Sequence, residues 1–205
     1  MAITTMVLGK SGTGKSRSML NLNPADVALI QAIKKPLPFR SKEWKPFPTD
    51  DHSKIIQSMY KATQAGRKII IIDDFQYLMA NEFMRRSDER GYDKFTEIAK
   101  HAWEVITHAN GLPDDVRVYI LSHTEESDNG QIKIKTIGKM LDEKITLEGM
   151  VTIVLRTHID GDKYFFATQN NGSDTVKSPE GLFESRYIDN DLALVDKAIT
   201  DYYGA

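Results

Sequence analysis

The 205-residue chain contains no cysteine. This absence excludes disulfide bonds and thiolate metal sites, and it is compatible with a reducing compartment. Long apolar runs are also missing, since no stretch of the sequence approaches the roughly 20 residues that a membrane span needs. Residues 1–8 lack the basic segment and long apolar stretch of a secretory signal. We therefore expect a cytoplasmic protein with no membrane partner.

The chain also lacks an excess of charge of either sign. It has 27 Lys and Arg residues against 29 Asp and Glu residues, which gives a formal net charge of -2. Any contact with nucleic acid must therefore come from a local basic loop and not from the overall field. No internal repeat or low-complexity linker divides the sequence. A chain of this length with 40% hydrophobic residues predicts one domain over residues 1–205.

Apolar patterning predicts strands that alternate with helices. The expected strands lie at residues 4–8, 27–33, 68–72, 117–122, 150–156 and 163–169, and the expected helices at 15–22, 53–65, 96–109 and 191–202. Residues 40–52 are expected to be irregular. The four isoleucines at 69–72 show no alternation, which indicates a strand buried on both faces. This pattern predicts an α/β fold with a mostly parallel central sheet flanked by helices.

A glycine-rich loop follows the first expected strand. Its pattern, Gly9-x-x-x-x-Gly14-Lys15-Ser16, is a complete Walker A motif between a strand and a helix. Glycines allow the backbone N–H groups to turn toward a phosphate, and the N-terminus of the following helix favours the same anion. The sequence therefore predicts an ATP site with Mg²⁺, in which Lys15 reaches the β- and γ-phosphates. The expected nucleotide-binding residues are Gly9, Lys10, Ser11, Gly12, Thr13, Gly14, Lys15, Ser16 and Arg17.

Two adjacent acids, Asp73 and Asp74, end the isoleucine-rich strand. A P-loop enzyme needs such a carboxylate for the metal, and we expect Ser16 and Asp73 to be the Mg²⁺ ligands. Asp74 has two alternative roles: it polarises the attacking water, or it caps the next turn.

The next buried strand ends in Leu121-Ser122-His123-Thr124-Glu125. His123 is placed to sense the γ-phosphate, and the alternative is a histidine with a structural role. The remaining histidines, at positions 52, 101, 108 and 158, show no zinc-ligand spacing and receive no chemical role from the sequence.

Several segments together resemble the small RecA-like ATPases of bacteriophages, some of which are single-strand annealing proteins. The matching segments are GKSGTGKS, KKPLPF, IIIIDDF, LSHTEE and TVKSPEGLF, and the resemblance covers most of residues 3–195. It implies a P-loop NTPase fold with a RecA-like core. It also implies head-to-tail homo-oligomers, as a filament or ring, with ATP between protomers and single-stranded DNA near the axis. A phage-encoded protein of this kind would act in the cytoplasm of its bacterial host.

The resemblance places DNA contacts on two loops, at residues 81–94 and 127–144. The implied DNA-binding residues are Arg85, Arg86, Arg90, Lys133, Lys135 and Lys139. Such cations give sequence-independent affinity that falls with salt. Acidic residues are mixed among them, so the alternative is that they are ordinary solvated charges.

The resemblance also gives Lys177 a catalytic role in the nucleotide site of an adjacent protomer. Arg156 competes for that role, and a surface lysine in a hairpin turn is the plain alternative. In RecA proteins a glutamate activates the water from the strand after the P-loop helix, but residues 27–36 here contain no acid. Either Asp74 or Glu125 takes over, or hydrolysis is slow and ATP acts mainly as an assembly switch.

The sequence thus favours a RecA-like ATPase that binds single-stranded DNA and promotes recombination or annealing. One alternative is a nucleotide-dependent loader for a protein partner, such as a replicative helicase or a single-strand-binding protein. The aromatic segment around Trp44 and Phe47 would either serve such a partner or cover the sheet edge. Another alternative is a small-molecule kinase, against which stands the lack of an arginine-rich lid in the C-terminal third.

Overall fold

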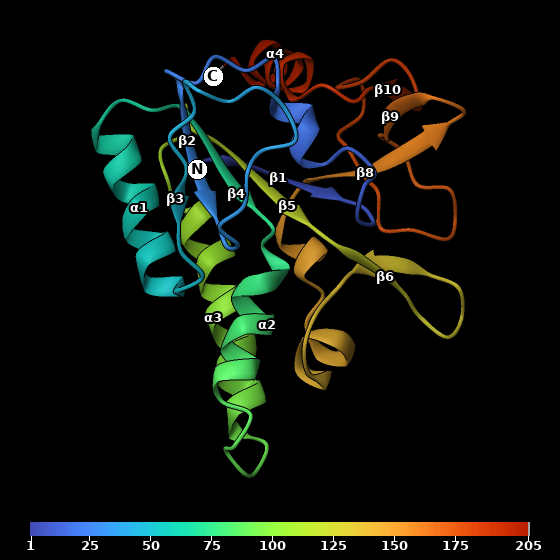
Figure 1. Cartoon of the computed structure of the whole chain (residues 1–205). Coiled ribbons are helices and arrows are strands. Elements are labelled where there is room, and N and C mark those ends of the chain that lie inside the picture. The colour runs from blue at the N-terminus through green and yellow to red at the C-terminus, as the bar shows by residue number, and fades with distance from the viewer. Residues whose placement is uncertain (205) are drawn as a thin grey trace.

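The computed structural model describes residues 1–204, with the side chains of Asp142 and Glu143 left out of the description. Its centre is an eight-stranded sheet in the order β10-β9-β8-β1-β5-β4-β2-β3 (Figure 1). The six strands from β8 to β3 in this order run parallel, and β9 and β10 continue antiparallel. Their bounds are β1 (Ile3–Leu8), β2 (Val27–Gln31), β3 (Phe47–Pro48), β4 (Ile69–Asp73), β5 (Arg117–Ser122), β8 (Ile153–Asp160), β9 (Lys163–Ala167) and β10 (Tyr187–Asp189). The predicted α/β fold, with a mostly parallel central sheet flanked by helices, is confirmed.

Helices cover both faces of this sheet. α1 (His52–Gln64), α2 (Gln76–Arg85) and α3 (Asp93–Asn110) pack on one face, and α4 (Leu192–Tyr203) packs on the other (Figure 1). The strands supply both cores because their side chains alternate: Ile70 and Ile72 of β4 join the first core, and Ile69 and Ile71 join the second. The expectation of a strand buried on both faces is therefore confirmed.

A small hairpin stands apart from the main sheet. It consists of β6 (Thr124–Glu126) and β7 (Ile132–Ile134), and it begins immediately after His123. The backbone N–H of Lys135 donates to the carbonyl oxygen of His123 at 2.8 Å, which closes the base of the hairpin. A π-helical turn at Met140–Lys144 and a 3-10 turn at Leu147–Met150 lead back to β8. Figure 1 shows the hairpin and α1 at opposite sides of the molecule.

Three local expectations were wrong. The helix expected over residues 15–22 is only a 3-10 turn, Ser16–Met19. The hydroxyl of Ser18 donates to the carbonyl oxygen of Lys15 at 2.6 Å, and such a local bond competes with regular helix formation. The first expected DNA loop, 81–94, is helical at both ends, because α2 continues to Arg85 and α3 begins at Asp93. The segment 40–52 contains β3 and the first residue of α1.

The aromatic segment around Trp44 and Phe47 lies at the edge of the sheet. Phe47 and Pro48 form β3, which pairs with Ile30 and Gln31 of β2, and Trp44 packs edge-on against Phe39. This segment therefore covers part of the edge strand, as one of the two alternatives anticipated. Among residues 1–204, no helix combines the length and apolar character needed to cross a membrane.

A buried polar cluster fixes α4 to the sheet. The guanidinium of Arg117 on β5 donates to both carboxylate oxygens of Asp196 on α4, at 3.0 Å and 2.9 Å. The hydroxyl of Tyr119 donates to the same carboxylate at 2.7 Å. Burial, and then the charge of Asp196, raises the pKa of Tyr119 well above its ordinary value, so the phenol keeps its proton and acts as a donor.

We expect Asp196→Ala to lower the free energy of unfolding by about 3 kcal/mol, because it leaves a buried guanidinium and a buried phenol without their shared acceptor. Urea denaturation followed by circular dichroism measures this loss. The matched control is Asp201→Ala on the same helix, where the carboxylate pairs with exposed Lys197. The control should cost less than about 1 kcal/mol, and equal losses for the two variants would contradict a special role for the buried cluster.

Candidate nucleotide site

The predicted site residues meet at the carboxyl ends of three neighbouring parallel strands. The glycine-rich loop follows β1, His123 follows β5 and Asp73-Asp74 ends β4, and β5 lies between the other two strands. Ligands of open α/β sheets bind at this edge. A cavity of about 370 Å³ lies there, lined by Ser11, Gly12, Gly14, Lys15, Ser16, Arg17, Lys35, Pro36, Pro38, Asp74, His123 and Tyr164.

The loop has the backbone conformation that its glycines make possible. Gly12 and Gly14 have φ angles of 77° and 98°, in the left-handed region where other residues are strained. Gly9 is needed for a different reason, since a Cβ at this position would lie 1.9 Å from the Oγ1 of Thr157 on β8. The hydroxyls of Thr13 and Thr157 are hydrogen-bonded at 2.7 Å. Thr157 therefore shapes the loop, a contact that the sequence alone did not indicate.

Lys15 places its ammonium inside the loop. Its Nζ donates to the carbonyl oxygens of Gly9 and Lys10, each at 2.8 Å, and only 5% of the residue is exposed. Burial lowers the pKa of Lys15 to about 8, although the charges of Asp74 and Asp73 act in the opposite direction. A cation in this position gains strongly from a bound anion, because the phosphate would replace some of the solvation that burial removed.

Asp73, the last residue of β4, contacts Ser16. The Ser16 hydroxyl donates to the two carboxylate oxygens of Asp73, at 2.9 Å and 3.1 Å, and Asp73 is fully buried. Burial, followed by the charge of Asp74, raises the pKa of Asp73. One hydroxyl and one carboxylate in contact are the oxygen donors that Mg²⁺ takes from a protein, so these residues fit the metal.

Asp74 turns its carboxylate into the cavity from a left-handed backbone, with φ of 61°. The alternative of a helix cap is wrong, because the N-cap of α2 is Phe75 and has no side-chain capping bond. The Asp74 carboxylate instead forms an ion pair with Lys35 and lies 3.5 Å from Nε2 of His123. Burial acts to raise the pKa of Asp74, but the hydrogen bonds of His123 and Lys35 outweigh it and lower the pKa.

Lys35 is the main site residue that sequence reasoning missed. It follows β2 at the same edge of the sheet, and Pro36 and Pro38 continue along the cavity. The sequence KKPLPF contributed only to the resemblance. A lysine just beyond the carboxyl end of a parallel strand was the signal available, because that position faces the phosphate loop in this type of sheet.

Asn190 and Tyr164 border the loop from the antiparallel end of the sheet. Asn190 is 7% exposed, and among the described residues neither atom of its side-chain amide has a hydrogen-bond partner. A Cβ on Gly14 would lie 2.9 Å from the Oδ1 of Asn190 and 3.1 Å from the ring of Tyr164. A buried amide with a free donor and a free acceptor is costly unless a ligand satisfies it. This feature also fits a nucleotide at the loop.

Other predicted catalytic residues lie elsewhere. Glu125 is on β6 and forms an ion pair with Lys133 at 3.9 Å, and Lys177 forms a backbone bridge with Val154. Neither residue is among those that line the described cavity. The guanidinium of Arg156, the competitor of Lys177, contacts the buried carboxylate of Asp174 at 3.0 Å.

The predicted DNA-binding residues fall into two groups. Arg85 pairs with Asp50 at 2.7 Å, and Arg86 forms ion pairs with three glutamates at 2.6–3.0 Å, so both arginines are engaged within the chain. Arg90 is exposed between α2 and α3. The lysines of the second group lie on β7 or shortly after it, at positions 133, 135 and 139. Gly138, next to Lys139, lies against Phe95 near the start of α3.

No protein-family model matches the chain, and no curated protein matches its sequence. Among solved structures, the chain is similar to the KaiC-like protein PH0186 of the hyperthermophilic archaeon Pyrococcus horikoshii OT3. The two are 13% identical, the match covers 80% of this chain and 76% of that one, and the TM-score is 0.43. We therefore base the function on the geometry of the site.

We expect Gly9→Ala to abolish saturable binding of a fluorescent ATP analogue with Mg²⁺, because the added methyl collides with Thr157 and displaces the loop. Fluorescence titration measures the binding, and circular dichroism shows whether the fold is retained. Gly149→Ala is the matched control, since its nearest neighbour would be a Thr146 carbon at 3.9 Å, an ordinary contact. A Gly9→Ala protein that binds as tightly as the parent would place the nucleotide elsewhere.

Proposed function

We propose that the chain is a Mg²⁺-dependent ATPase whose nucleotide state controls binding to single-stranded DNA during recombination or annealing. One observation carries the ATPase part: the Ser16 hydroxyl contacts the buried Asp73 carboxylate, whose charge acts on the Lys15 ammonium. Together they place two metal ligands and a phosphate-binding cation at one end of the same loop.

Each of these residues has a separate role in the proposed hydrolysis. Loop amides and Lys15 bind the phosphates, and Ser16 and Asp73 hold the metal. When bound, Mg²⁺ neutralises charge on the phosphate oxygens. Asp74 orients the attacking water and accepts the proton that this water loses. The water oxygen bonds to the γ-phosphorus while the bond from that phosphorus to the bridging oxygen breaks. Its lowered pKa keeps Asp74 ionised at neutral pH, as a proton acceptor must be.

The position of Asp74 supports its choice over Glu125. The Asp74 carboxylate faces the cavity between Lys35 and His123, whereas Glu125 lies on the hairpin next to Lys133. In this proposal Asp74, which follows β4, takes the role of the glutamate that RecA proteins carry on the strand after the P-loop helix. That glutamate has no counterpart after β2 of this chain. Lys35 adds a second cation to the cavity, where it balances the charge of the triphosphate.

The DNA-binding part of the proposal rests on the hairpin. His123 lines the cavity, and the carbonyl oxygen of the same residue accepts a hydrogen bond from Lys135 at the base of the hairpin. A γ-phosphate that shifts His123 therefore also shifts the hairpin and the residues that follow it, which carry Lys133, Lys135 and Lys139. Cations at the positions of Lys135 and Lys139, both exposed, suit contacts to a phosphodiester backbone.

We also propose that the protein acts as a homo-oligomer. Lys177 lies outside the cavity of its own chain, on the far side of β8 from β1, where it pairs with Val154. This placement supports a contact to the nucleotide of an adjacent protomer, where a cation would stabilise charge on the transferring phosphoryl group.

We expect Asp74→Asn to reduce the rate of phosphate release at least about 100-fold, a typical effect of removing a positioned base. Glu125→Gln is the matched control and should retain most of the activity. Lys15→Ala should abolish turnover because it removes the phosphate-binding cation. A Glu125→Gln protein that is inactive beside an active Asp74→Asn protein would reverse the assignment of the base.

We expect the triple variant Lys133→Ala, Lys135→Ala, Lys139→Ala to bind single-stranded DNA more weakly while keeping its basal ATPase activity. The slope of log affinity against log salt should fall by up to about 2, since each lost phosphate contact contributes about 0.7. Fluorescence anisotropy with a labelled oligonucleotide measures both quantities.

The control for this experiment carries the same change in charge at another surface. Lys45, Lys54 and Lys61 are exposed on or beside α1, and their replacement by alanine should leave the salt slope unchanged. Equal losses in the two triple variants would show that DNA responds to net charge and not to the hairpin.

A further inference from the structure

Two histidines and a glutamate that are far apart in the sequence meet on the face of the sheet covered by α1 and α3. His52 is the first residue of α1, and His101 and Glu104 lie three residues apart on α3. A spacing of three places His101 and Glu104 on the same side of that helix. No chemical role for these histidines could be inferred from the sequence, because 49 positions separate them and the packing of α1 on α3 brings them together.

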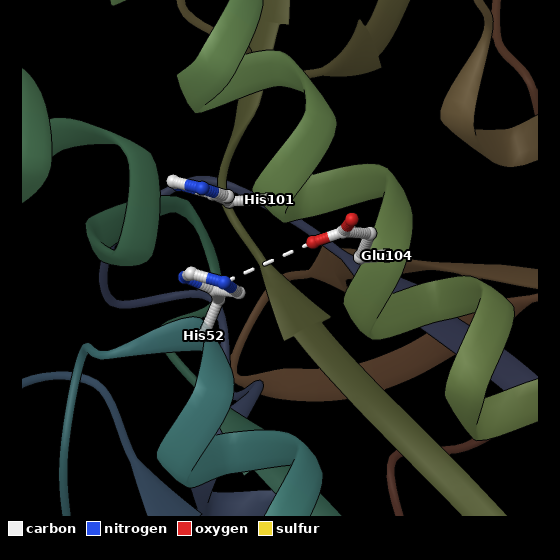
Figure 2. A group of neighbouring side chains, drawn as sticks. All are labelled: His52, His101 and Glu104. Atoms are coloured by element: carbon white, nitrogen blue, oxygen red, sulfur yellow. Dashed lines mark ion pairs between the residues drawn. The ribbon is translucent and has the colours of Figure 1, made fainter.

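Their side chains converge on a small volume. One potential ligand atom from each of the three residues lies within 4.8 Å of the other two. The side chains are about one-quarter exposed, with 25% for His52, 22% for His101 and 27% for Glu104, so solvent reaches the group. Figure 2 shows the two imidazole rings facing each other, and the Glu104 carboxylate directed toward His52. The Nε2 of His52 and the Oε2 of Glu104 are 3.8 Å apart.

A second carboxylate orients one of the rings. The Nδ1 of His101 is within hydrogen-bonding distance of both oxygens of Glu82 on α2, at 3.0 Å and 2.8 Å. When Nδ1 of neutral His101 carries the proton and donates a hydrogen bond to Glu82, the lone pair of the ring is on Nε2. This carboxylate–histidine pairing is the arrangement that supports metal-bound histidines, because it fixes the tautomer and makes the ligand nitrogen more basic.

The other ring lies against His101. The rings of His52 and His101 are stacked at 3.7 Å with an angle of 7° between their planes, an arrangement that disfavours charge on both rings. Asp51 caps α1 through the backbone N–H of Lys54 and so fixes the start of the helix that carries His52.

We propose that His52, His101 and Glu104 form a binding site for a divalent transition-metal ion of the zinc type. Two imidazoles and one carboxylate, with water in a fourth position, are a common ligand set for Zn²⁺. Such an ion is the species that all three lone-pair donors can share. The site is distinct from the nucleotide cavity, and the proposal does not depend on the ATPase function.

Binding requires one local movement. Imidazole lone pairs lie in the plane of the ring, so two stacked rings cannot both direct a nitrogen at one ion. Glu82 holds His101, whereas Nε2 of His52 contacts the hydroxyl of the neighbouring Ser53 at 3.1 Å and the carboxylate of Glu104 at 3.8 Å. His52 is therefore the ring that turns, and the ion ties the start of α1 to the middle of α3.

The test is a titration of the nucleotide-free, chelator-treated protein with ZnCl₂ in competition with a chromophoric chelator. The Asp73→Asn background removes the carboxylate of the nucleotide site as a competing ligand. One equivalent of Zn²⁺ should bind, and His101→Gln and Glu104→Gln should each weaken binding at least tenfold. Glu82→Gln, which removes the charge of the carboxylate that orients His101 and also pairs with Arg86, should weaken it about 10–100-fold. Co²⁺ as a second probe should give a visible absorption band that the same variants lose.

Two matched controls carry the same substitution at histidines outside the cluster. His108 contacts Tyr60, and His158 stacks on Tyr187. His108→Gln and His158→Gln should bind Zn²⁺ as the parent does. The proposal is overturned if the parent shows no saturable binding. It is also overturned if His101→Gln and Glu104→Gln bind as tightly as the parent, or if the control variants lose affinity to the same extent.

Discussion

The hydrogen bonds between the Ser16 hydroxyl and the Asp73 carboxylate connect the two parts of the site. Ser16 follows the loop after β1, and Asp73 ends β4, which is separated from β1 by β5. The contact exists only because these strands are parallel and in register, with Leu8 beside Ser122 and Ile72 beside Ile120. The sheet register therefore sets the geometry of the proposed metal site, and the two hydrophobic cores hold that register from both faces.

The surroundings of this contact control the charges at the site. Asp73 is buried beside another carboxylate, so its pKa rises, whereas Asp74 faces Lys35 and His123, so its pKa falls. The pKa values of these two neighbouring carboxylic acids at the end of β4 therefore shift in opposite directions. This difference supports the proposed roles, in which the buried acid holds the metal and the acid that faces the cavity acts on the water.

Much of the fold and part of the site could be predicted from the sequence. The isoleucine run at 69–72 identified a strand buried on both faces, and the Walker A pattern identified the loop, since both signals are local. Lys35, Thr157 and Asn190 reach the site from β2, β8 and the end of β10, and no short pattern connects them to the loop. The pairing of His52 with His101 has the same origin, because it results from helix packing. The short turn after Lys15 was missed for a different reason, since the Ser18 hydroxyl bond competes with helical propensity.

That short turn has a consequence for how the loop holds an anion. Aligned peptide dipoles give a long helix a positive end, but a 3-10 turn of four residues contributes few of them. In a phosphate loop that is followed by a long helix, the helix dipole and the lysine both attract the phosphate. Here the Lys15 side chain supplies the larger part of that attraction. Replacing Lys15 with an uncharged residue would therefore leave a bound polyanion with the backbone amides and Lys35 as its partners in the cavity.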